Sequence, residues 1–412
     1  MIWLYNLLWA VVLILGAPVW LPWVFLSASR RRGFAERCSA LPARPAPTIW
    51  LHAASVGEAE AAAPLIARMQ ERGLPLVLTT STVTGRDRLR ARFSELPVQL
   101  IPLDLPGLAQ RSLRRARVRT LVLVETELWP NLMRAATTAG VRVVIVSARI
   151  SDRSYRWYLR LRPLFASLLC DVDRVGARSE TDRARFTALG VREERATLVG
   201  DLKLDRPPAL AASEELRGAL GPGPFLIGGS THAGEEEALL RAWRELREGA
   251  ASGLRLLLVP RHPQRVPAVC TLLERHGARF GLRSEGAADA EVVIVDTVGE
   301  LASLYALADL VFCGGTLARV GGHNLIEPVQ AGRVLVHGPH LENQRHQEQL
   351  LRPFGVLHRV GDSKELGRVL GELWADPERD APAERARQGL LAHRGAVERA
   401  LELVLPESAP HA

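Results

Sequence analysis

Cysteine and lysine are both scarce in this chain. The four cysteines are far apart, without a Cys-x-x-Cys pair or histidines at zinc-ligand spacing, so we expect reduced thiols and neither a disulfide framework nor a structural zinc site. Of the 53 basic residues only Lys203 and Lys364 are lysines, and the other 51 are arginines. With 45 acidic residues the formal net charge is +8, which favours an anionic partner such as a nucleotide, a phosphorylated lipid or a membrane surface.

Two nucleotide-binding signatures are also missing. No Gly-x-Gly-x-x-Gly opens the first strand–helix unit and no Walker lysine motif occurs, which argues against dinucleotide and nucleoside-triphosphate enzymes. One pattern resembles a metal site, because Asp171-Val172-Asp173 has the Asp-x-Asp spacing that some transferases use for a divalent ion. It lies between a helix and the start of a strand, which is the wrong end of the strand for a ligand. We therefore expect no metal ion and no cofactor.

Charged side chains are absent from the first 29 residues. The segment Ile2–Leu26 is almost wholly apolar and longer than the roughly 20 helical residues that cross a bilayer. Four arginines follow it between residues 30 and 37, whereas a cleaved signal peptide carries positive charge in front of its apolar run. The positive-inside rule then places the remaining chain in the cytoplasm. Pro18 and Pro22 keep a second interpretation open, a kinked anchor that lies in the membrane interface.

Apolar runs of strand length alternate with helix-length segments through the rest of the chain. At about 100–200 residues per domain, the 412 residues make two or three domains. A break near Gly200–Ala212, rich in proline and aspartate, divides the series. We expect strands at Thr48–His52, Pro75–Thr79, Val98–Ile101, Thr120–Val124, Arg142–Val146, Asp173–Gly176, Phe225–Gly229, Leu254–Val259, Glu291–Val295, Leu310–Gly314 and Arg333–His337.

This alternation predicts an α/β fold with parallel sheets covered on both faces. The simplest organisation is an N-terminal membrane-anchor helix over residues 1–29 and two Rossmann-like, doubly wound domains at residues 30–203 and 204–412. A ligand cleft is expected between the two domains, at the carboxyl ends of their strands. The tail from Ser363 to Leu405 is expected to form helices.

The first candidate for chemistry is Glu58. It follows the first predicted strand and opens an alanine-rich helix, on the rim where open α/β sheets bind ligands. A carboxylate at this place can act as a general base that takes a proton from an attacking hydroxyl. The alternative is that Glu58 only complements the helix dipole, as acidic residues in first turns commonly do.

Two loops of the second predicted domain offer groups for an anion. After Phe225–Gly229, the small hydroxyl residues Ser230 and Thr231 precede a helix start, whose free N–H groups can bind an anion; the alternative is an ordinary capping box. The next strand ends at Arg261 and His262, where a guanidinium can hold a phosphate or carboxylate. The alternative for Arg261 is an exposed loop arginine.

A glycine-rich segment after Leu310–Gly314 is more specific. Paired glycines at 314–315 and 321–322 let the backbone approach a ligand closely, and Gly315 lies in the first pair. Asn324 is expected to cap a helix whose first turn presents Glu327. A carboxylate there can accept both hydroxyls of a ribose while the helix end faces a phosphate. This arrangement is typical of nucleotide-sugar transferases with two Rossmann-like domains.

A series of short motifs then points to one family. The motifs are His52–Glu58, Thr79–Thr82 with Gly85, Pro102–Pro106, Glu125–Asn131, Ser147–Ser151, Gly200–Asp205, Ser230–Glu235, Pro260–Pro263 and Gly321–Asn324. In this order the chain, from its apolar start to about residue 350, resembles the 3-deoxy-D-manno-octulosonic acid (Kdo) transferases of lipopolysaccharide synthesis. It departs from many of them after Gly338-Pro339-His340, where Leu341–Gln344 replaces an Asn-Phe pair, and after Arg37.

The resemblance implies a GT-B fold and a metal-independent, inverting transfer of Kdo from CMP-Kdo to the lipid A precursor. The catalytic domains would face the cytoplasm at the bacterial inner membrane, without a nucleic-acid partner. Glu58 would be the general base. The groups that would hold the CMP moiety are Ser230, Thr231, Arg261, His262, Gly315, Asn324 and Glu327. Helix ends and arginines can stabilise a nucleoside monophosphate leaving group without a cation.

Lys203 and several arginines complete the expected site. In a chain that otherwise uses arginine, a lysine before the linker suggests that a compact ammonium is wanted, for the Kdo carboxylate; chance is the alternative. The implied acceptor is an acylated, bisphosphorylated disaccharide. Arg149 and Arg153, near aromatic residues, are the expected acceptor-binding groups, and Arg86–Arg92 offers a second patch. Either patch is alternatively a solvated helix face.

Two other functions are compatible with the sequence. One is a different GT-B transferase that moves a sugar from a UDP-sugar to a membrane lipid. The other is a membrane-anchored nucleotide-sugar binding or scaffold protein without turnover.

Overall fold

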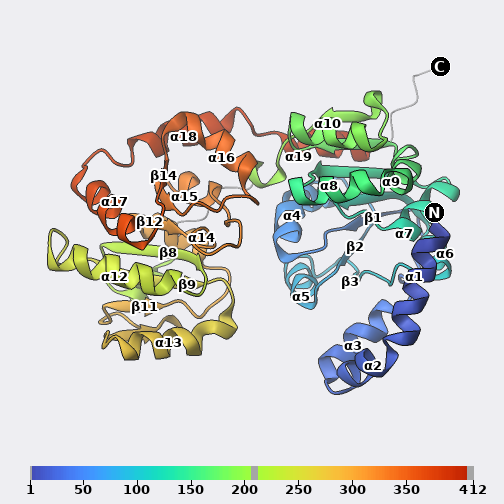
Figure 1. Ribbon diagram of the computed structural model, residues 1–412. Coiled ribbons are helices and arrows are strands. Elements are labelled where there is room, and N and C mark those ends of the chain that lie inside the picture. Colours follow the sequence, from blue (N-terminus) through green and yellow to red (C-terminus); the bar gives the residue numbers. More distant parts are fainter. Residues whose placement is uncertain (1, 206–211, 406–412) are drawn as a thin grey trace. The chain divides into compact units, whose positions relative to one another are not determined.

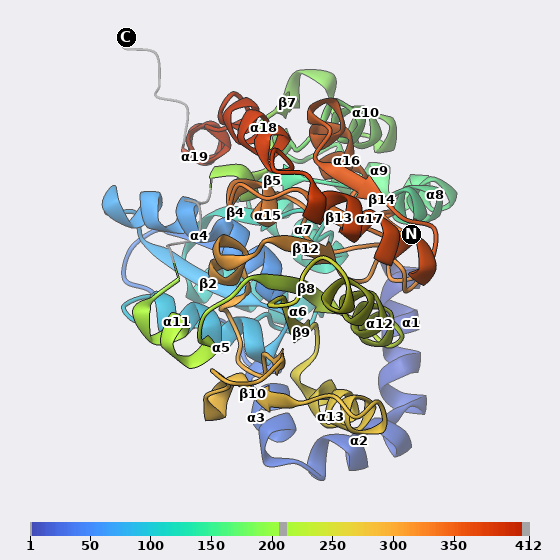
Figure 2. The same cartoon turned by 90° about the vertical axis from the view of Figure 1, so that its left-hand side faces the viewer.

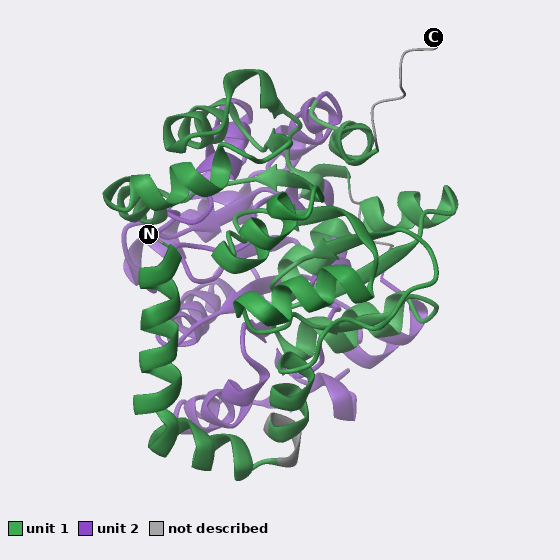
Figure 3. Cartoon of the chain, turned by 90° about the vertical axis from the view of Figure 1, so that its right-hand side faces the viewer, with its two compact units in different colours: residues 1–206, 393–412 green, residues 207–392 purple. Residues whose placement is uncertain are grey.

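The computed structural model describes residues 2–205 and 212–405 (Figure 1). The chain forms two compact units, residues 1–206 with 393–412, and residues 207–392 (Figure 3). The helix α19 (Ala396–Val404) therefore belongs to the first unit, whereas the sequence grouped it with the second domain of residues 204–412. The prolines at 207 and 208, expected in the linker, lie outside the described residues.

The first unit contains a parallel seven-stranded sheet in the order β3-β2-β1-β4-β5-β6-β7. This is the Rossmann order, in which β2 and β3 are added on one side of β1 and β4 to β7 on the other, so that the strand order reverses between β1 and β4. The strands are β1 (Thr48–His52), β2 (Leu76–Thr80), β3 (Val98–Leu100), β4 (Val118–Val124), β5 (Arg142–Ala148), β6 (Arg174–Ala177) and β7 (Ala196–Leu198). Ligands of such sheets bind at the carboxyl edge near the reversal, so a ligand site is expected at the residues after β1, β4 and β5.

Helices cover both faces of this sheet. The described helices of the first unit, including those that do not pack on the sheet, are α1 (Ile2–Leu15), α2 (Ala17–Phe25), α3 (Ala28–Arg37), α4 (Val56–Glu71), α5 (Val83–Arg92), α6 (Pro106–Arg115), α7 (Pro130–Thr138), α8 (Asp152–Arg160), α9 (Arg162–Leu169), α10 (Glu180–Leu189), η1 (Glu193–Arg195), η2 (Leu202–Asp205) and α19. Along β5, Val143 and Ile145 enter the core beneath α6, α7, α9 and α10, while Val144 and Val146 enter the core beneath α4, α5 and α19. Because both faces of the strands are buried, their sequences are continuous apolar runs instead of alternating apolar and polar residues.

The second unit repeats the architecture with a sheet in the order β10-β11-β9-β8-β12-β13-β14 (Figure 2). Its strands are β8 (Phe225–Thr231), β9 (Arg255–Pro260), β10 (Phe280–Leu282), β11 (Val292–Ile294), β12 (Leu310–Cys313), β13 (Leu335–His337) and β14 (Leu357–Arg359). Its helices are α11 (Glu214–Leu220), α12 (Glu235–Glu248), η3 (Pro263–Arg265), α13 (Val266–Arg275), η4 (Arg283–Glu285), α14 (Leu301–Leu304), η5 (Tyr305–Leu307), α15 (Ile326–Gln330), α16 (Arg345–Leu351), η6 (Arg352–Phe354), α17 (Ser363–Ala375) and α18 (Ala381–Leu391). The reversal lies between β8 and β12, and both sheets confirm the predicted α/β class.

The apolar N-terminal segment is a bent pair of helices. Among the described residues no single helix is long and apolar enough to cross a membrane, but α1 and α2 together pass that test with a bend of 65°. At the bend a side chain on Gly16 would come within 2.5 Å of the Val12 carbonyl oxygen, so glycine permits the close approach. The indole N–H of Trp20 donates to the Leu13 carbonyl at 3.1 Å, which satisfies an acceptor that the break would otherwise expose.

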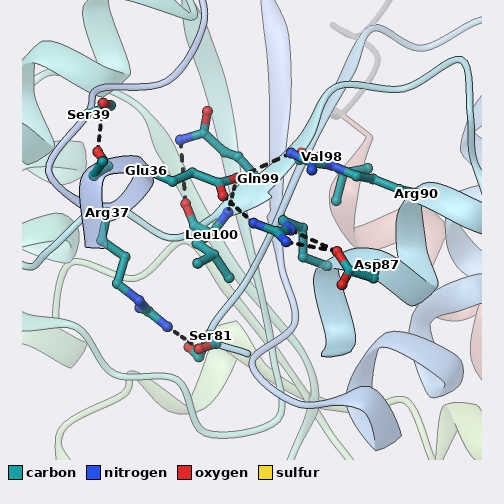
Figure 4. A network of polar contacts seen from close by, with 11 residues as sticks. Glu36, Arg37, Ser39, Ser81, Asp87, Arg90, Val98, Gln99 and Leu100 are labelled. Atoms are coloured by element: carbon teal, nitrogen blue, oxygen red, sulfur yellow. Dashed lines mark hydrogen bonds and ion pairs between the residues drawn. The ribbon is translucent and has the colours of Figure 1, made fainter. Parts of the chain in front are cut away.

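The helix α3 closes one edge of the first sheet. Its Glu36 carboxylate accepts a hydrogen bond from the backbone N–H of Leu100 in the edge strand β3 (2.9 Å), and from Arg86 (2.5 Å) and Arg90 (3.3 Å) of α5 (Figure 4). Arg37 donates to the Ser81 carbonyl in the same network. An open edge strand invites pairing with other chains, and the carboxylate of Glu36 occupies one of its free N–H groups.

Candidate active site

Glu58 lies at the start of α4, directly after β1. The Ser55 hydroxyl caps the helix, accepting from the N–H of Glu58 (3.2 Å) and donating to its Oε1 (3.0 Å). The other carboxylate oxygen, Oε2, accepts from the Ala54 N–H (2.8 Å). These contacts form a variant of the capping box, so the helix-start role considered from the sequence is real. They also hold the carboxylate at the rim where β1 ends.

The environment of Glu58 favours its protonated form. Burial of the carboxyl group and the negative charges of Glu125 and Glu127 raise the pKa of Glu58 to about 7, although the hydrogen bonds from Ala54 and Ser55 act in the opposite direction. A helix-capping glutamate on an open surface would keep a pKa near 4. A general base works best with a pKa near the operating pH, so Glu58 has the property that proton abstraction from a hydroxyl requires.

The neighbouring residue Glu125 has a strained backbone. It follows the last residue of β4 with a φ of 61°, and Ser147, near the end of β5, has a φ of 50°. Residues with a Cβ adopt this left-handed conformation at a cost of about 1–3 kcal/mol, and such positions concentrate at functional sites. Both residues lie at the carboxyl edge of the sheet. The N–H of Glu125 donates to the carbonyl of Val146 (3.0 Å), the residue before Ser147.

Cations keep Glu125 ionised. The Lys203 ammonium lies 3.0 Å from Oε1 of Glu125, and an Arg149 guanidinium nitrogen lies 3.8 Å from Oε2. Burial acts to raise the pKa of Glu125, but Lys203, Arg149 and Arg178 outweigh it, and the pKa lies below its usual value. The first unit therefore presents a fixed negative charge, two adjacent cations and the weaker acid Glu58 on one rim.

A buried ion pair supports the turn that carries Lys203. The Arg178 guanidinium lies 3.1 Å from Oδ2 of Asp201, and both side chains are only 2% exposed. The second oxygen of Asp201 accepts from the Lys203 N–H at 3.0 Å. Removing one partner of a buried pair costs about 3–5 kcal/mol, so Arg178 and Asp201 fix the position of the lysine backbone.

A third carboxylate, Glu127, belongs to the same rim. Its Oε2 accepts from the indole N–H of Trp129 (3.0 Å) and lies 3.5 Å from Nε2 of the buried His52. The other imidazole nitrogen, Nδ1, contacts the Thr79 hydroxyl at 2.9 Å. A carboxylate can only accept, so this arrangement favours the His52 tautomer with its proton on Nε2.

Sequence reasoning assigned no role to Glu125, Glu127 or His52, although all three were in the motifs that carry the resemblance. A signal was present, because Glu125 and Glu127 follow an apolar strand and therefore reach the same rim as Glu58. Lys203 was expected to bind the donor, and the structure places it in the first unit, in η2, against Glu125.

In the second unit, Glu235 organises the loop after β12. Its carboxylate is almost fully buried and accepts five backbone hydrogen bonds. The donors are the N–H groups of His232 (2.9 Å), Gly315 (2.8 Å), Thr316 (2.9 Å), Leu317 (3.0 Å) and Ala318 (3.1 Å). The alternative considered for Ser230 and Thr231, a capping box at this helix start, is wrong, because both residues belong to β8 and Gly234 is the N-cap residue of α12.

Three histidines meet at this loop. The rings of His232 and His323 are coplanar within 5°, with their Nε2 atoms 2.8 Å apart, and His262 packs edge-on against His232. Burial, together with the charge of Arg261 and of the other two histidines, lowers the pKa of His323 to about 4. Burial also lowers the pKa of His232. The pair is therefore neutral near pH 7 and shares one hydrogen bond.

The expected donor-binding residues lie around the same edge of the second sheet. Ser230 has a φ of 56°, Thr231 is buried, and Arg261 and His262 are exposed on the loop after β9. Gly315 has a φ of 69°, and a Cβ there would come within 2.9 Å of the His323 ring. The Asn324 side chain accepts from the Ile326 N–H (2.9 Å), but the N-cap residue of α15 is Leu325 and not Asn324 as expected; Glu327 is half-buried in the first turn of α15.

The expected acceptor arginines have different surroundings. Arg149 is half-buried beside Glu125, whereas Arg153 is exposed on α8 together with Trp157, which is 55% exposed. The second patch, on α5, is engaged elsewhere, because Arg88 and Arg92 contact Glu60 while Arg86 and Arg90 contact Glu36. Within residues 2–205 and 212–405, no group of three or more His, Cys, Asp or Glu side chains has a metal-binding arrangement.

Two doubly wound parallel sheets, each with its polar side chains at the carboxyl edge, define the GT-B class of proteins. A glycosyltransferase from Rickettsia africae shares this fold with a TM-score of 0.60, covering 88% of this chain and 98% of the other at 11% identity.

The sequence comparisons identify the family. Residues 27–206 match the family described as 3-deoxy-D-manno-octulosonic-acid transferase. A 3-deoxy-D-manno-octulosonic acid transferase of Bordetella pertussis is 35% identical, covering 94% of this chain and 96% of the relative. The corresponding Haemophilus influenzae protein is 32% identical, covering 92% and 90%. The chain belongs to the Kdo transferase family and is a glycosyltransferase, which confirms the resemblance seen in its motifs.

Proposed function

We propose that this enzyme transfers Kdo from CMP-Kdo to a lipid A precursor at the cytoplasmic face of the inner membrane, with inversion at the anomeric carbon. The single observation that carries the chemistry is Glu58, a carboxylate at the carboxyl edge of the first sheet whose pKa is raised to about 7. A hydroxyl of the acceptor attacks the anomeric carbon and gives its proton to Glu58. The bond between that carbon and the phosphate oxygen breaks, and CMP leaves with the electron pair.

The residues of the second unit are proposed to hold CMP. Arg261 and His262 are exposed on the loop after β9, where they can contact the phosphate, and Glu327 is proposed to accept the ribose hydroxyls. Glu235 gives this binding loop a fixed shape, since it engages the N–H groups of Gly315–Ala318. Ser230, Thr231 and Asn324 complete the proposed set. Fixed donors and cations stabilise the developing charge of the leaving phosphate.

Lys203 and the arginines of the first unit are proposed to position anionic groups. An ammonium has three hydrogens, and Glu125 accepts from one of them at 3.0 Å. We assign another to the carboxylate that distinguishes Kdo from neutral sugars. Arg149 and Arg153 are proposed to contact phosphates of the acceptor, and the exposed Trp157 its apolar part.

The test uses purified enzyme with CMP-Kdo, with and without the lipid A precursor. We expect CMP release only when both substrates are present, and a lipid product with added Kdo by mass spectrometry. Release of UDP from a UDP-sugar would contradict the proposed donor. Glu58→Gln should still bind CMP-Kdo but lose at least about 100-fold in rate, the usual contribution of a general base. Undiminished turnover would exclude Glu58, and binding without turnover in the wild type would indicate a scaffold protein.

A further inference from the structure

The first residues of the apolar segment, and the helix α3 that follows the segment, are both hydrogen-bonded to the body of the first unit. At the start of the segment, the Tyr5 hydroxyl donates to Oδ2 of Asp104 (2.9 Å), and the side-chain amide of Asn131 donates to the side-chain Oδ1 of Asn6 (2.7 Å). Asp104 also accepts from the N–H groups of Asn131 (3.0 Å) and Leu132 (2.8 Å) at the start of α7. The contacts of Tyr5 and Asn6 are therefore made to residues that the fold holds firmly.

After the apolar segment, the end of α3 returns to the same place. Glu36 accepts from the Leu100 N–H (2.9 Å), as Figure 4 shows, and the Arg37 carbonyl accepts from the Leu103 N–H (2.8 Å). The attachment points of the two ends thus fall within Leu100–Asp104. Four residue steps span at most about 14 Å, whereas the hydrocarbon core of a bilayer is about 30 Å thick.

The side chains of α1 divide into two faces. Tyr5 and Asn6, which carry the hydrogen bonds, are half-buried, as are Trp9, Ala10 and Leu13 one and two turns later. The other face is apolar and exposed. The exposed large apolar side chains of α1 and α2, with the residue that follows, are Trp3, Leu4, Leu7, Leu8, Val11, Val12, Ile14, Leu15, Val19, Leu21, Trp23, Phe25 and Leu26. An apolar surface of this size marks a site of contact with lipid or protein.

Two backbone carbonyl groups of the helix pair α1 and α2 have hydrogen-bond partners within the protein, so they do not need water. The bend at Gly16 leaves the Leu13 carbonyl paired with the Trp20 indole, and the Phe25 carbonyl at the end of α2 accepts from Arg31 (2.5 Å). In hydrocarbon every backbone polar group needs such a partner.

We propose that α1 and α2 enter only the cytoplasmic leaflet of a lipid bilayer and return, so that both ends stay on the side of the catalytic units. This proposal rests on the membrane attachment in the proposed function and replaces a spanning helix by a re-entrant one. The bonds from Tyr5 and Asn6 to the body are incompatible with a span, because a span would put residues 5 and 104 on opposite sides of the membrane.

The first test is a cross-link in native membranes. In a chain whose four cysteines are alanine, Asn6→Cys with Asn131→Cys should be joined by a short bis-maleimide, while the control pair Trp23→Cys with Asn131→Cys should not. Kdo transfer by each variant reports that it is folded. An active variant in membranes without the Asn6–Asn131 cross-link would overturn the proposal.

The second test is the accessibility of Asn6→Cys, on the face of α1 that contacts the body, to a membrane-impermeant maleimide in the chain without other cysteines. We expect labelling in inside-out vesicles and none in intact spheroplasts, and a chain that keeps only the exposed native Cys38 is the cytoplasmic reference. Labelling of Asn6→Cys from outside would show a span and overturn the proposal.

The failures are distinguishable. A wild-type chain that does not sediment with vesicles would refute membrane attachment altogether. A sedimenting chain labelled from outside refutes the re-entrant topology alone, and a sedimenting chain with both ends inside that releases no CMP refutes the proposed reaction alone.

Discussion

The ammonium of Lys203 lies 3.0 Å from the carboxylate of Glu125. This ion pair keeps Glu125 negative, and the negative charge of Glu125 in turn raises the pKa of Glu58. A residue that sequence reasoning assigned to the donor thus also acts on the proposed base through a second carboxylate. The relationship leads to two predictions on pH dependence.

The first prediction concerns the wild type. If Glu58 must be deprotonated to act as the base, kcat/KM should rise with pH, tenfold per unit below about 7, and level off above it. Initial rates at low substrate concentration, measured with buffers of constant ionic strength, check this profile. A flat profile down to about pH 5 would contradict a base with a raised pKa.

The second prediction separates Glu125 from Glu58. Glu125→Gln removes a negative charge beside Glu58, so the pKa of Glu58 should fall and the acid limb of kcat/KM should move to lower pH, whatever happens to the maximal rate. Glu60→Gln, on the same helix as Glu58, is the control and should leave the limb in place. A limb that stays near the wild-type midpoint in Glu125→Gln would show that Glu125 does not influence the base.

Folding stability should depend on Glu58 in the opposite sense to activity. Because the pKa of Glu58 is higher in the folded chain than in the unfolded one, its contribution to stability is complete below the unfolded value, about 4.5, and is lost as the pH rises through about 7. Gln resembles the protonated acid. Glu58→Gln should therefore have a higher Tm than wild type at about pH 8.5 and a similar Tm at about pH 4. Equal melting curves at the higher pH would argue against the raised pKa.

The loop held by Glu235 should be sensitive to a change of one atom. Glu235→Gln places an amide NH2 where a carboxylate oxygen now accepts backbone N–H groups, so we expect the second unit to lose about 2–4 kcal/mol and CMP binding to weaken. Glu248→Gln, exposed at the end of the same helix, is the matched control. Urea unfolding and calorimetric titration with CMP measure the two effects, and similar values for both variants would refute this role of Glu235.

Close packing leaves no room for a side chain at Gly314, whose own φ angle is not positive. A Cβ at Gly314 would lie 2.2 Å from the Ser230 carbonyl oxygen, which is backbone and cannot move aside cheaply. Gly314→Ala should therefore destabilise the second unit by more than about 2 kcal/mol and weaken CMP binding. In the control Gly218→Ala, where nothing lies within 4 Å, a gain of about 0.5–1 kcal/mol is expected because alanine favours the helix. Equal stability of the two variants would contradict this account.

Eleven strands could be predicted from the sequence, and all eleven are present. The strands that were missed, β7, β10 and β14, each have three residues and lie at sheet edges. Edge strands are buried less and need no continuous apolar run, so Leu357–Arg359, with its histidine and arginine, gives no hydrophobic signal. Helix α19 was recognised as a helix, but its attachment to the first unit rests on Asp205, which accepts from the N–H groups of Gly395 and Val397. Such a contact across 190 positions has no local signature.

The sequence predicted which site residues follow directly after a strand. It did not predict the pKa of a side chain or its hydrogen-bond partners, because these depend on residues from other strands. Glu58 could be named from its place after β1, but the sequence alone left its two roles open, because the burial and the neighbouring charges of Glu125 and Glu127 come from other strands. Likewise, Glu235 was read as part of a helix start, whereas its carboxylate shapes a loop 80 residues away.

The placement of α19 has a consequence for how the protein is made. The buried residues of this helix complete the core beneath α4, yet they are the last part of the described chain to leave the ribosome. The second unit is thus inserted in the chain between two parts of the first, and its 186 residues emerge before the first unit can finish folding. Until Ala396–Val404 is synthesised, the apolar residues of the first unit that pack against α19 lack this helix as a cover. Completion of the first unit therefore requires residues on both sides of the second unit, and not its own sheet alone.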